Sequence, residues 1–520
     1  MSAMCQPVGV GGTTPRWVVA DFVPRNLEGE HITSASFGRA ACLNLGPCSR
    51  AAWAVLLVCA ALAAANPGPA SWAAGASNSF NVREAGATGD GLALDTAAIN
   101  LAITNCSARG GGVVVFPPGR YLSGTVRLQS GVTLLLESGA ALIGATNLAH
   151  YQEYQPPPDT PEGRFRSHWH RALILGVGVT NVAIVGPGLI DGHKVFDPQG
   201  EERMRGPHTI LLGDSREIVF RDFSIHDSAN YAVMLENCQQ VQARNLRITG
   251  GWDGLHFRGW PGRPCRDVSI LGCQFYTGDD AIAGRYWENV LISDCIINSA
   301  CNGIRLIGPA NHLIIQNCLF YGPGVHPHRT SNRFNMLAGI NLQPGAWDAT
   351  AGTLDDVLIS DVTLHRVTTP FHFMLKPGNT AGRITVSRAS ATAVYRTAAS
   401  VESWAGTPFT NVVFRDVTID YEGGGKPGEV PLTVRSPGVD ARPLPSWGFY
   451  ARGVENLVLE NVRLHCLKDD LRPVLIADQV GRLTFEGFRF PGVKGADGPL
   501  LLTNVAEVIT RDAGAAPTVR

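Results

Sequence analysis

The sequence lacks an excess of charge of either sign. Lysine and arginine number 43, aspartate and glutamate number 44, and the net charge at pH 7 is -1. A chain with this balance has no overall field that would attract nucleic acid or an anionic membrane. Charged residues make up only 17% of the chain and apolar residues 45%. The composition therefore excludes a disordered protein and is sufficient for a hydrophobic core.

The N-terminal part also lacks an apolar run long enough for an ordinary membrane span. Residues 51–65 form an apolar run of 15 residues between Arg50 and a segment of small residues. This length is short for a transmembrane helix but suits the core of a secretory signal, with cleavage after Ala65 or near Ala76. We therefore expect residues 50–76 to be a signal peptide, the protein to be secreted or periplasmic, and no stable membrane span. An uncleaved anchor is the alternative.

The 49 residues before Arg50 are too many for the start of a signal peptide. We expect translation to begin near Leu43 or Leu45, so that residues 1–49 are not part of the mature protein. N-terminal sequencing of exported protein tests this expectation. A mature chain that begins near Met1 would contradict it.

No two of the 12 cysteines have the CxxC spacing of a structural zinc site. Four of them occupy similar places in successive repeats, and we expect these to stack as small apolar core residues: Cys238, Cys273, Cys295 and Cys318. Disulfides are permitted in an exported protein, but the sequence does not pair them. The segments 168–170 and 326–328 carry His-x-His spacing, which we interpret as loop residues. We expect neither a metal nor a cofactor.

Glycine and proline are abundant, at 59 and 33 residues, and short apolar phrases recur between the turns they indicate. From residue 218 these phrases return at intervals of 22 to 27 residues, beginning at positions 218, 241, 268, 290 and 313. A repeat of this period predicts a solenoid in which each coil buries its apolar face against the next. Leucine-rich repeats share the period, but their fixed leucine and asparagine pattern is absent. Two or three short alternating strands per repeat favour a parallel β-helix.

We expect residues 77–520 to form a single all-β domain of this kind. Apolar residues at helical spacing in residues 95–107 predict one short helix, which would cap the first coil. Strands are predicted at 113–116, 121–128 and 132–136. Three irregular insertions are expected to be loops that shape a binding groove: 152–171, 326–337 and 398–407.

Three similar phrases at 253–257, 280–284 and 302–306 each follow an apolar run of the same kind. Their alternation directs one set of side chains into the core, namely Leu255, Phe257, Ile282, Ile304, Leu306, Ile340 and Leu342. The set directed outward is His256, Arg258, Ala283, Arg285, Arg305, Asn341 and Gln343. His256 is either a proton carrier or a surface residue. The three outward arginines bind an acidic ligand or form a solvated stripe paired with nearby carboxylates.

Asp253, Asp279 and Asp280 precede the outward side chains on adjacent coils. Coils stack about 4.8 Å apart, so these carboxylates are expected to lie close together. Mutual repulsion then raises one pKa in the group, and a protonated acid beside an ionised base is what cleavage of a glycosidic bond requires. A single aspartate in such a turn often only caps backbone groups. We interpret the three together as catalytic.

At these residues the chain resembles the polygalacturonase family of glycoside hydrolases (family 28), over roughly residues 80–505. The most specific likenesses are Trp252-Asp253-Gly254 to the family's Asn-Thr-Asp-Gly and residues 278–283 to its Gly-Asp-Asp-Cys-Ile-Ala. Residues 85–91 and 447–452 are similar to less specific family segments. The resemblance implies a right-handed parallel β-helix of the pectin-lyase-like superfamily and hydrolysis with inversion. It also implies that Asp279 is the general acid and that Asp253 and Asp280 activate the water.

Two departures from the family pattern bear on the substrate. The family's Gly-His-Gly stands here as Cys301-Asn302-Gly303, and its Arg-Ile-Lys as Asn341-Leu342-Gln343. Neither replacement can form the ion pairs of the original residues. Relatives that cleave rhamnogalacturonan also lack the histidine, so a rhamnogalacturonan-like or other non-homogalacturonan pectic substrate is favoured. The substrate-binding candidates are His256, Arg258, Arg285, Asn302, Arg305, Asn341 and Gln343.

The leading hypothesis is thus a secreted inverting glycosidase that acts on a pectic or related plant polysaccharide or oligosaccharide. One alternative is a polysaccharide lyase on the same fold, which would need a Brønsted base and usually Ca²⁺. The other is a carbohydrate-binding or adhesin-like β-helix without activity, to which Asn302, Asn341 and Gln343 lend support. The sequence leaves the exact sugar, endo or exo action and the oligomeric state open.

Overall fold

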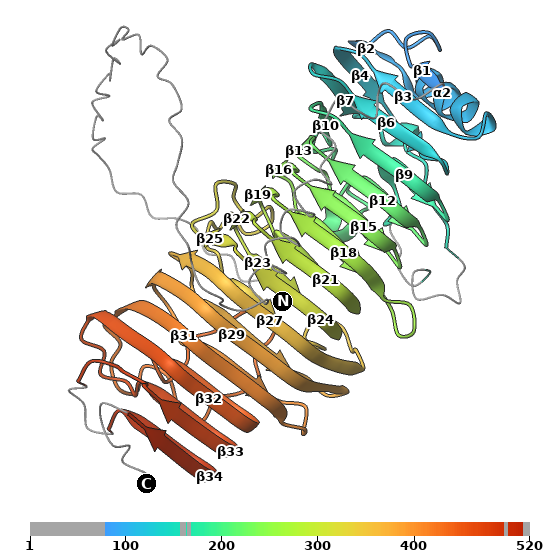
Figure 1. Cartoon of the computed structure of the whole chain (residues 1–520). Helices are drawn as coiled ribbons and strands as arrows, with labels where there is room; N and C mark the ends of the chain where they lie inside the picture. Colours follow the sequence, from blue (N-terminus) through green and yellow to red (C-terminus); the bar gives the residue numbers. More distant parts are fainter. Residues whose placement is uncertain (1–77, 157–162, 164–167, 493–497, 513–520) are drawn as a thin grey trace, which may run out of the picture. The chain divides into compact units, whose positions relative to one another are not determined.

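The computed structural model describes residues 78–156, 163, 168–492 and 498–512. The expected signal peptide at residues 50–76 and residues 1–49 lie outside this part, so both remain predictions. All paired strands of the described residues run parallel and belong to one continuous sheet. This sheet winds around a single core, as a parallel β-helix does (Figure 1).

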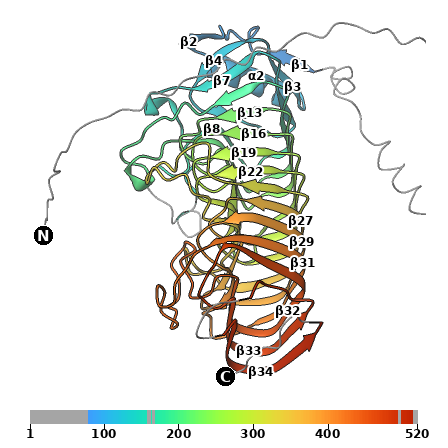
Figure 2. The same ribbon diagram turned by 90° about the vertical axis from the view of Figure 1, so that its left-hand side faces the viewer.

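The strands stack in three columns, in which each strand pairs with its equivalents in the coils before and after. The first column consists of β1 (Ser79–Asn81), β3 (Gly112–Phe116), β6 (Val132–Leu136), β9 (Thr180–Val185), β12 (Arg216–Arg221), β15 (Gln239–Arg244), β18 (Cys265–Leu271), β21 (Trp287–Ser293), β24 (Ala310–Gln316), β27 (Gly352–His365), β29 (Asn379–Val394), β31 (Phe409–Gly423), β32 (Phe449–Lys468), β33 (Leu475–Glu486) and β34 (Leu500–Arg511). The second column consists of β2 (Asp90–Leu94), β4 (Gly119–Ser123), β7 (Ala140–Gly144), β10 (Leu189–Asp191), β13 (Ser224–His226), β16 (Arg247–Thr249), β19 (Gln274–Thr277), β22 (Ile296–Ser299) and β25 (Leu319–Tyr321). Figure 2 shows β13, β16, β19 and β22 one above another.

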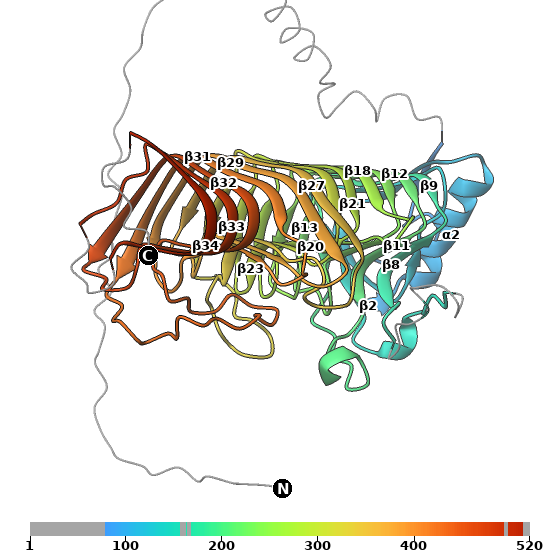
Figure 3. The same ribbon diagram turned by 90° about the horizontal axis from the view of Figure 1, so that it is seen from below.

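The third column is called the site column below, because it carries the outward side chains singled out in the sequence. It consists of β5 (Val126–Arg127), β8 (Ala172–Val177), β11 (His208–Gly213), β14 (Val233–Glu236), β17 (Leu255–Arg258), β20 (Ile282–Arg285), β23 (Asn302–Leu306), β26 (Ala338–Leu342), β28 (Phe371–Leu375) and β30 (Ala399–Ser403), and it continues into the start of β32. Loops from several coils emerge beside β8, β11, β20 and β23 (Figure 3). Two 3-10 turns, η1 (Leu148–His150) and η3 (Glu201–Arg203), lie in such connections.

Inward side chains of all three columns form one hydrophobic core that runs from Val82 to Leu502. The four cysteines predicted to stack in the core are buried there, and all eight cysteines of the described residues are free thiols. The seven side chains predicted to point inward also belong to this core. These predictions are confirmed because the alternation of a strand leaves only one face available to apolar side chains.

The single predicted helix is present as α2 (Thr96–Ala108), beside the first coils in Figure 1. It packs on β1, β3 and β5 through Ile99, Ala102, Ile103 and Cys106, and so covers the edge of the stack. The predicted strand at 121–128 is instead two strands, β4 and β5. The chain bends at Gly124, where an added Cβ would lie 2.0 Å from the carbonyl oxygen of His150.

The turns between the first and second columns repeat one backbone conformation. Asp222, Asn245, Asp294 and Asn317 have φ values from 49° to 68° in successive coils, and Gly272 occupies the same place with φ 62°. Asparagine, aspartate and glycine tolerate this left-handed region better than other residues. Asn245 also donates a hydrogen bond to Asp222 at 2.9 Å, so the turn residues hold neighbouring coils together.

One of the three predicted loops is wrong. Residues 398–407 contain β30, a buried strand of the site column in which Ala399 and Val401 point inward. The longest irregular insertion of this region is residues 424–448, between β31 and β32, which we call the C-terminal loop. The loop at 326–337 is confirmed, and the loop at 152–171 is described only in part. Within the described residues, no helix has the length and apolarity needed to cross a membrane.

Candidate active site

The strands β17, β20 and β23 stack in register, and the turns before β17 and β20 carry the candidate catalytic side chains. His256, Ala283 and Arg305 are aligned across these strands, as are Arg258 and Arg285. Asp253, Asp279 and Asp280 lie in the turns just before β17 and β20. The stacking of coils therefore brings the residues of separate sequence phrases to one place on the site column.

The three aspartates are close neighbours and are almost fully buried. One oxygen of each lies within 4.8 Å of one oxygen of the other two. Between 4% and 8% of each residue is exposed. Three carboxylates this close cannot all be ionised without a large energetic cost in a poorly hydrated site. The cluster predicted from the sequence is therefore formed, and its charge state is set by its neighbours.

Asp280 is held by donors from the next coil. The backbone nitrogen and the side-chain Nδ2 of Asn302 donate to Asp280 Oδ1 at 2.9 and 2.7 Å. Arg305 Nη1 donates to Asp280 Oδ2 at 3.2 Å. Asn341 in turn donates to Asn302 Oδ1 at 3.2 Å. Both oxygens of Asp280 thus accept hydrogen bonds from residues of the next coil.

Asp279 faces two basic side chains that come from loops. Arg205 Nη2 lies 3.7 Å from its Oδ2, and His328 Nε2 lies 3.6 Å from its Oδ1. Burial by itself raises the pKa of Asp279, but His328, Arg205 and Arg305 outweigh burial and lower this pKa to about 2. Asp279 is therefore ionised at neutral pH.

Asp253 has a neutral partner instead. His256 Nδ1 donates to Asp253 Oδ2 at 2.8 Å, while its Nε2 accepts from Arg258 at 3.5 Å. Burial and the charges of Arg258 and Arg285 hold the pKa of His256 well below its usual range. Burial and the charges of Asp279 and Asp280 raise the pKa of Asp253 well above its usual range. Within the cluster, a proton is therefore favoured at Asp253 over Asp279.

The arginines of the outward row are not solvated, so the alternative of an exposed stripe is wrong. Arg258, Arg285 and Arg305 are each no more than 6% exposed. Their guanidinium groups lie over the rings of Trp169, Trp260 and Trp347, at 5.0, 4.1 and 5.5 Å from the ring centroids. Arg285 forms an ion pair with Asp348, and Arg305 forms a second one with Asp440 at 3.0 Å. Loop residues thus cover and partly neutralise the arginines.

The polar residues Asn341 and Gln343 are completely buried at the same face. Asn341 Oδ1 and both polar atoms of the Gln343 side chain have no hydrogen-bond partner among the described residues. Buried polar atoms normally have partners, because leaving them unpaired costs about 1–3 kcal/mol. Because both residues are completely buried, a ligand reaches these amides only if the side chains that cover them move.

Several residues of the site are not marked by the sequence pattern. Arg205 lies in the connection between β10 and β11 and stacks on Trp252 at 3.9 Å. Tyr231 stacks on the imidazole of His256, with ring centroids 4.4 Å apart and planes 2° from parallel. His328 is indicated by the sequence only as a loop residue. No periodic pattern identifies these residues, because they lie in connections rather than in strands.

Together these side chains line a small hollow over the cluster, with a volume of about 40 Å³. It is lined by Arg205, Tyr231, Asp253, His256, Arg258, Asp279, Asp280, Ala283, Arg305, Ile307 and Trp347. A desolvated carboxylate cluster beneath aromatic and guanidinium groups is suited to acid–base chemistry on a bound polar ligand.

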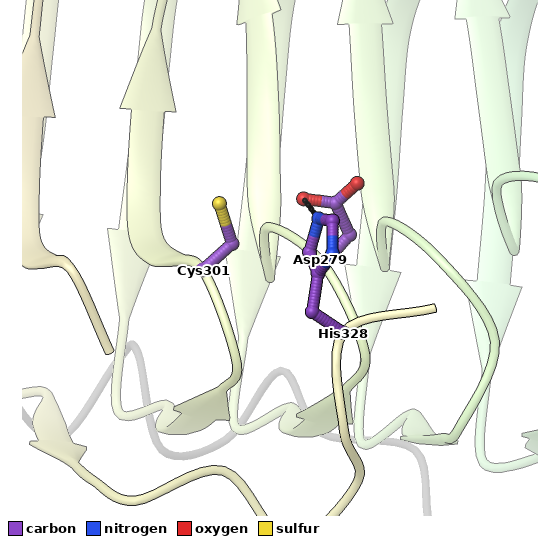
Figure 4. A group of neighbouring side chains, drawn as sticks. All are labelled: Asp279, Cys301 and His328. Carbon is purple, nitrogen blue, oxygen red and sulfur yellow. Dashed lines mark ion pairs between the residues drawn. The ribbon is translucent and has the colours of Figure 1, made fainter. Parts of the chain in front are cut away.

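Figure 4 shows Asp279 and His328 in contact, with Cys301 nearby on the next coil. These three residues offer ligand atoms within 4.8 Å of one another, as the three aspartates also do. Burial and the charges of Asp280 and Asp279 raise the pKa of Cys301 well above its usual range. Arg333 Nη2 also donates to Cys301 Sγ at 3.0 Å. A protonated thiol beside a guanidinium group is a poor metal ligand, so this donor set favours a hydrogen-bond network.

Comparison with known proteins gives the family context of this site. Residues 79–305 match the family described as "Rhamnogalacturonase A/epimerase, pectate lyase-like". A probable polygalacturonase of Vitis vinifera is 27% identical over 225 residues, which are 40% of this chain and 44% of the relative. An endo-polygalacturonase of Pectobacterium carotovorum subsp. carotovorum is 24% identical over 260 residues, which are 41% of this chain and 64% of the relative. The matches thus span less than two thirds of these relatives' own lengths.

The chain has a pectin-lyase-like fold and is distantly similar to polygalacturonases, at 24–27% identity. Among solved structures, the exopolygalacturonase of Thermotoga maritima has a TM-score of 0.56 at 16% identity, covering 75% of this chain and 92% of that one. This likeness supports the fold alone. The family match includes Asp253, Asp279, Asp280 and Asn302, whereas His328 lies beyond it.

Proposed function

We propose that this chain is a glycoside hydrolase that cleaves a pectic polysaccharide other than homogalacturonan, with a rhamnogalacturonan-like chain as the favoured substrate. The observation that carries the proposal is the buried cluster of Asp253, Asp279 and Asp280, in which the pKa of Asp253 is raised and the pKa of Asp279 is lowered. Hydrolysis of a glycosidic bond needs both a proton donor and a base at the same bond. The family match over residues 79–305 supports the proposal.

The roles of the three carboxylates follow from the family resemblance and the contacts. Asp279 is proposed to protonate the glycosidic oxygen, and Asp280, which accepts hydrogen bonds from Asn302 and Arg305, to accept a proton from the attacking water. Within the cluster a proton is favoured at Asp253, and proton positions belong to the coupled group rather than to single residues. The proposed inversion comes from the resemblance alone. The carboxyl groups of inverting enzymes are usually about 6.5–9.5 Å apart, whereas oxygens of these three carboxylates lie within 4.8 Å of one another.

The choice of substrate rests on the polar residues around the cluster. Arg258, Arg285 and Arg305 supply positive charge for an acidic sugar, although aspartates already pair with two of them. Asn341 and Gln343 offer neutral amides where the family pattern has cations. A chain that alternates acidic and neutral sugars fits this combination better than a uniformly acidic chain does, because the amides can bind hydroxyl groups.

The test is a screen of defined pectic oligosaccharides with wild type and Asp280→Asn. We expect the wild type to release reducing ends from rhamnogalacturonan fragments, with the product anomer read by NMR. The variant should lose about 10²-fold or more in turnover, because it cannot accept a proton. Equal turnover of both proteins on every substrate would overturn the proposal. Products with a C4–C5 double bond, seen by ultraviolet absorbance, would indicate a lyase instead.

We also propose that residues 50–76 direct export, so that the enzyme meets its polymer outside the cytoplasm. The apolar run at 51–65 supports this proposal. N-terminal sequencing of protein from the culture medium or periplasm is the test, and retention of the whole protein in the cytoplasm would contradict it.

A further inference from the structure

The loop at residues 326–337 brings a titratable group to the proposed acid. His328 lies 49 positions after Asp279 in the sequence, yet its Nε2 is 3.6 Å from Asp279 Oδ1 (Figure 4). Its side chain is 12% exposed, so the imidazole touches both the buried carboxylate and solvent. At the first position of β23, where the resemblance would place a titratable partner, Asn302 cannot take up or release a proton.

The imidazole is held in one orientation by its own loop. The hydroxyl groups of Ser331 and Thr330 lie 3.0 and 3.2 Å from His328 Nδ1. The backbone nitrogen of His328 donates to the carbonyl of Arg333 at 2.8 Å, and the carbonyl of His328 accepts from Asn332 at 2.9 Å. Nδ1 can therefore keep its proton and donate it to a hydroxyl oxygen, while Nε2 faces Asp279.

An ionised Asp279 is a poor proton donor on its own. Both of its oxygens face basic groups, Arg205 at 3.7 Å and His328 at 3.6 Å, and only His328 can give up a proton under ordinary conditions. The pair holds the same number of protons in two arrangements. In one, Asp279 is ionised and the imidazole is protonated; in the other, both groups are neutral. The pair can therefore act as one acid.

We propose that His328 is the proton reserve for Asp279 in the hydrolysis proposed above. His328 Nε2 first gives its proton to Asp279 Oδ1, which leaves a neutral imidazole protonated at Nδ1 and a neutral carboxyl group on Asp279. As the bond between the anomeric carbon and the glycosidic oxygen breaks, the leaving oxygen keeps the bonding electrons and takes this proton, and Asp279 is ionised again. The attacking water gives its oxygen to the anomeric carbon and its proton to Asp280. Solvent then returns a proton to His328. The 3.6 Å separation must shorten in the substrate complex, as catalytic contacts often do.

Other charged or titratable groups surround this pair and set the pH at which it loses its proton. They are Arg205, Asp253, Asp280, Cys301, Arg305 and Arg333. The arginines favour the ionised form of Asp279, and the other two aspartates oppose it. Without His328, Asp279 would have to carry the proton alone among these groups, and it would lose that proton at lower pH.

The first experiment measures kcat/KM against pH for His328→Gln, with His326→Gln as the matched control from the same loop. Glutamine can contact Asp279 but cannot titrate. We expect about 10²-fold loss of kcat near pH 7 with little change in KM. The alkaline limb of the kcat/KM profile of His328→Gln should move to lower pH by about one unit or more. At that lower pH the variant should regain part of its activity. The control should keep the wild-type limb. A uniformly lowered profile with an unmoved limb would indicate a structural role and overturn the proposal.

The second experiment does not depend on activity. Carbon-13 NMR of aspartate-labelled protein reports the pKa of Asp279, which we expect to rise from about 2 in wild type toward its usual range in His328→Gln. An unchanged pKa would overturn the coupling between the two residues. If Asp280→Asn matches wild type on every substrate while the Asp279 pKa still responds to His328, the proposed hydrolysis fails and the coupling stands. The two failures are therefore distinguishable.

Discussion

Single residues of the site differ in what they contribute to stability and to charge. Asn302 connects Asp280 to Asn341 through buried hydrogen bonds and cannot titrate. Asp253 and Asp279 have opposite pKa shifts although they lie side by side, because basic side chains from the loops outweigh burial only at Asp279. The same carboxyl group therefore favours its protonated form at Asp253 and its ionised form at Asp279.

The raised pKa of Asp253 predicts a stability that depends on pH. Its stabilising contribution is fully present below its pKa in the unfolded chain, about 4, and is lost as pH rises through its higher pKa in the folded state. We therefore expect Asp253→Asn, which keeps the acceptor for His256, to raise Tm at pH 7 by about 2–4 °C. The difference should disappear below about pH 4. Calorimetry at both pH values measures it.

Asp279→Asn is the matched contrast. This variant removes an anion that Arg205 and His328 stabilise, and the contribution of that anion is present above about pH 4 and is lost as pH falls toward 2. It should therefore lower Tm at pH 7. If both substitutions lowered Tm equally at pH 7, the assignment of the favoured proton position to Asp253 would be wrong.

At the scale of elements, the site column supplies the floor of the site and the connections supply its walls. The C-terminal loop at 424–448 reaches the site through Asp440, which pairs with Arg305. The same loop is attached to β30 by Arg442, which donates to both oxygens of Glu402 at 3.0 and 2.7 Å. Glu402 is fully buried, so this pair fixes the loop over the end of the site.

Removing Arg442 should loosen this loop and destabilise the protein. Arg442→Ala leaves the buried carboxylate of Glu402 without its guanidinium partner, at a cost of about 3 kcal/mol. We expect a lower Tm and faster proteolytic cleavage within residues 424–448. Arg482→Ala, which breaks an exposed pair with Glu507, is the control and should change neither. Equal effects of the two substitutions would show that the buried pair does not hold the loop.

At the scale of the whole molecule, the described chain is a stack in which each coil contacts its neighbours and shares one core. Phe275 lies in the core of the coil that leads to Asp279, and Phe485 lies in a late coil, where it stacks on Phe488. Interactions in such a stack are short-ranged along its axis. A defect in one coil is therefore expected to disturb neighbouring coils far more than distant ones.

This locality can be tested by two equivalent core truncations. Phe275→Ala and Phe485→Ala should each cost about 3–5 kcal/mol, measured by denaturant unfolding. At a temperature where both remain folded, only Phe275→Ala should reduce turnover, because only that coil carries the carboxylates. Equal loss of turnover in both variants would mean that the stack responds as a whole.

The sequence by itself determined the repeating part of the protein. A period of two within strands and of 22 to 27 residues between coils specifies which side chains face the core and which share the outward row. The proximity of Asp253, Asp279, Asp280 and Asn302 therefore follows from the repeat pattern alone, as does the place of the buried cysteines in the core. Because the coils stack, residues at equivalent places in successive repeats become neighbours in space. The repeat pattern was therefore sufficient to predict these contacts.

Only the tertiary structure decided which side chains cover the outward row of the site column and which carboxyl group of the aspartate cluster favours a proton. Arg205, His328 and Asp440 come from connections whose course depends on packing against distant coils, and no periodicity marks them. The strand β30 differs from the predicted loop for the same reason, since short segments near turns carry little pattern. Burial and the placement of cations then separate the pKa values of Asp253 and Asp279, because electrostatic energies depend on distances and solvation that the sequence does not contain.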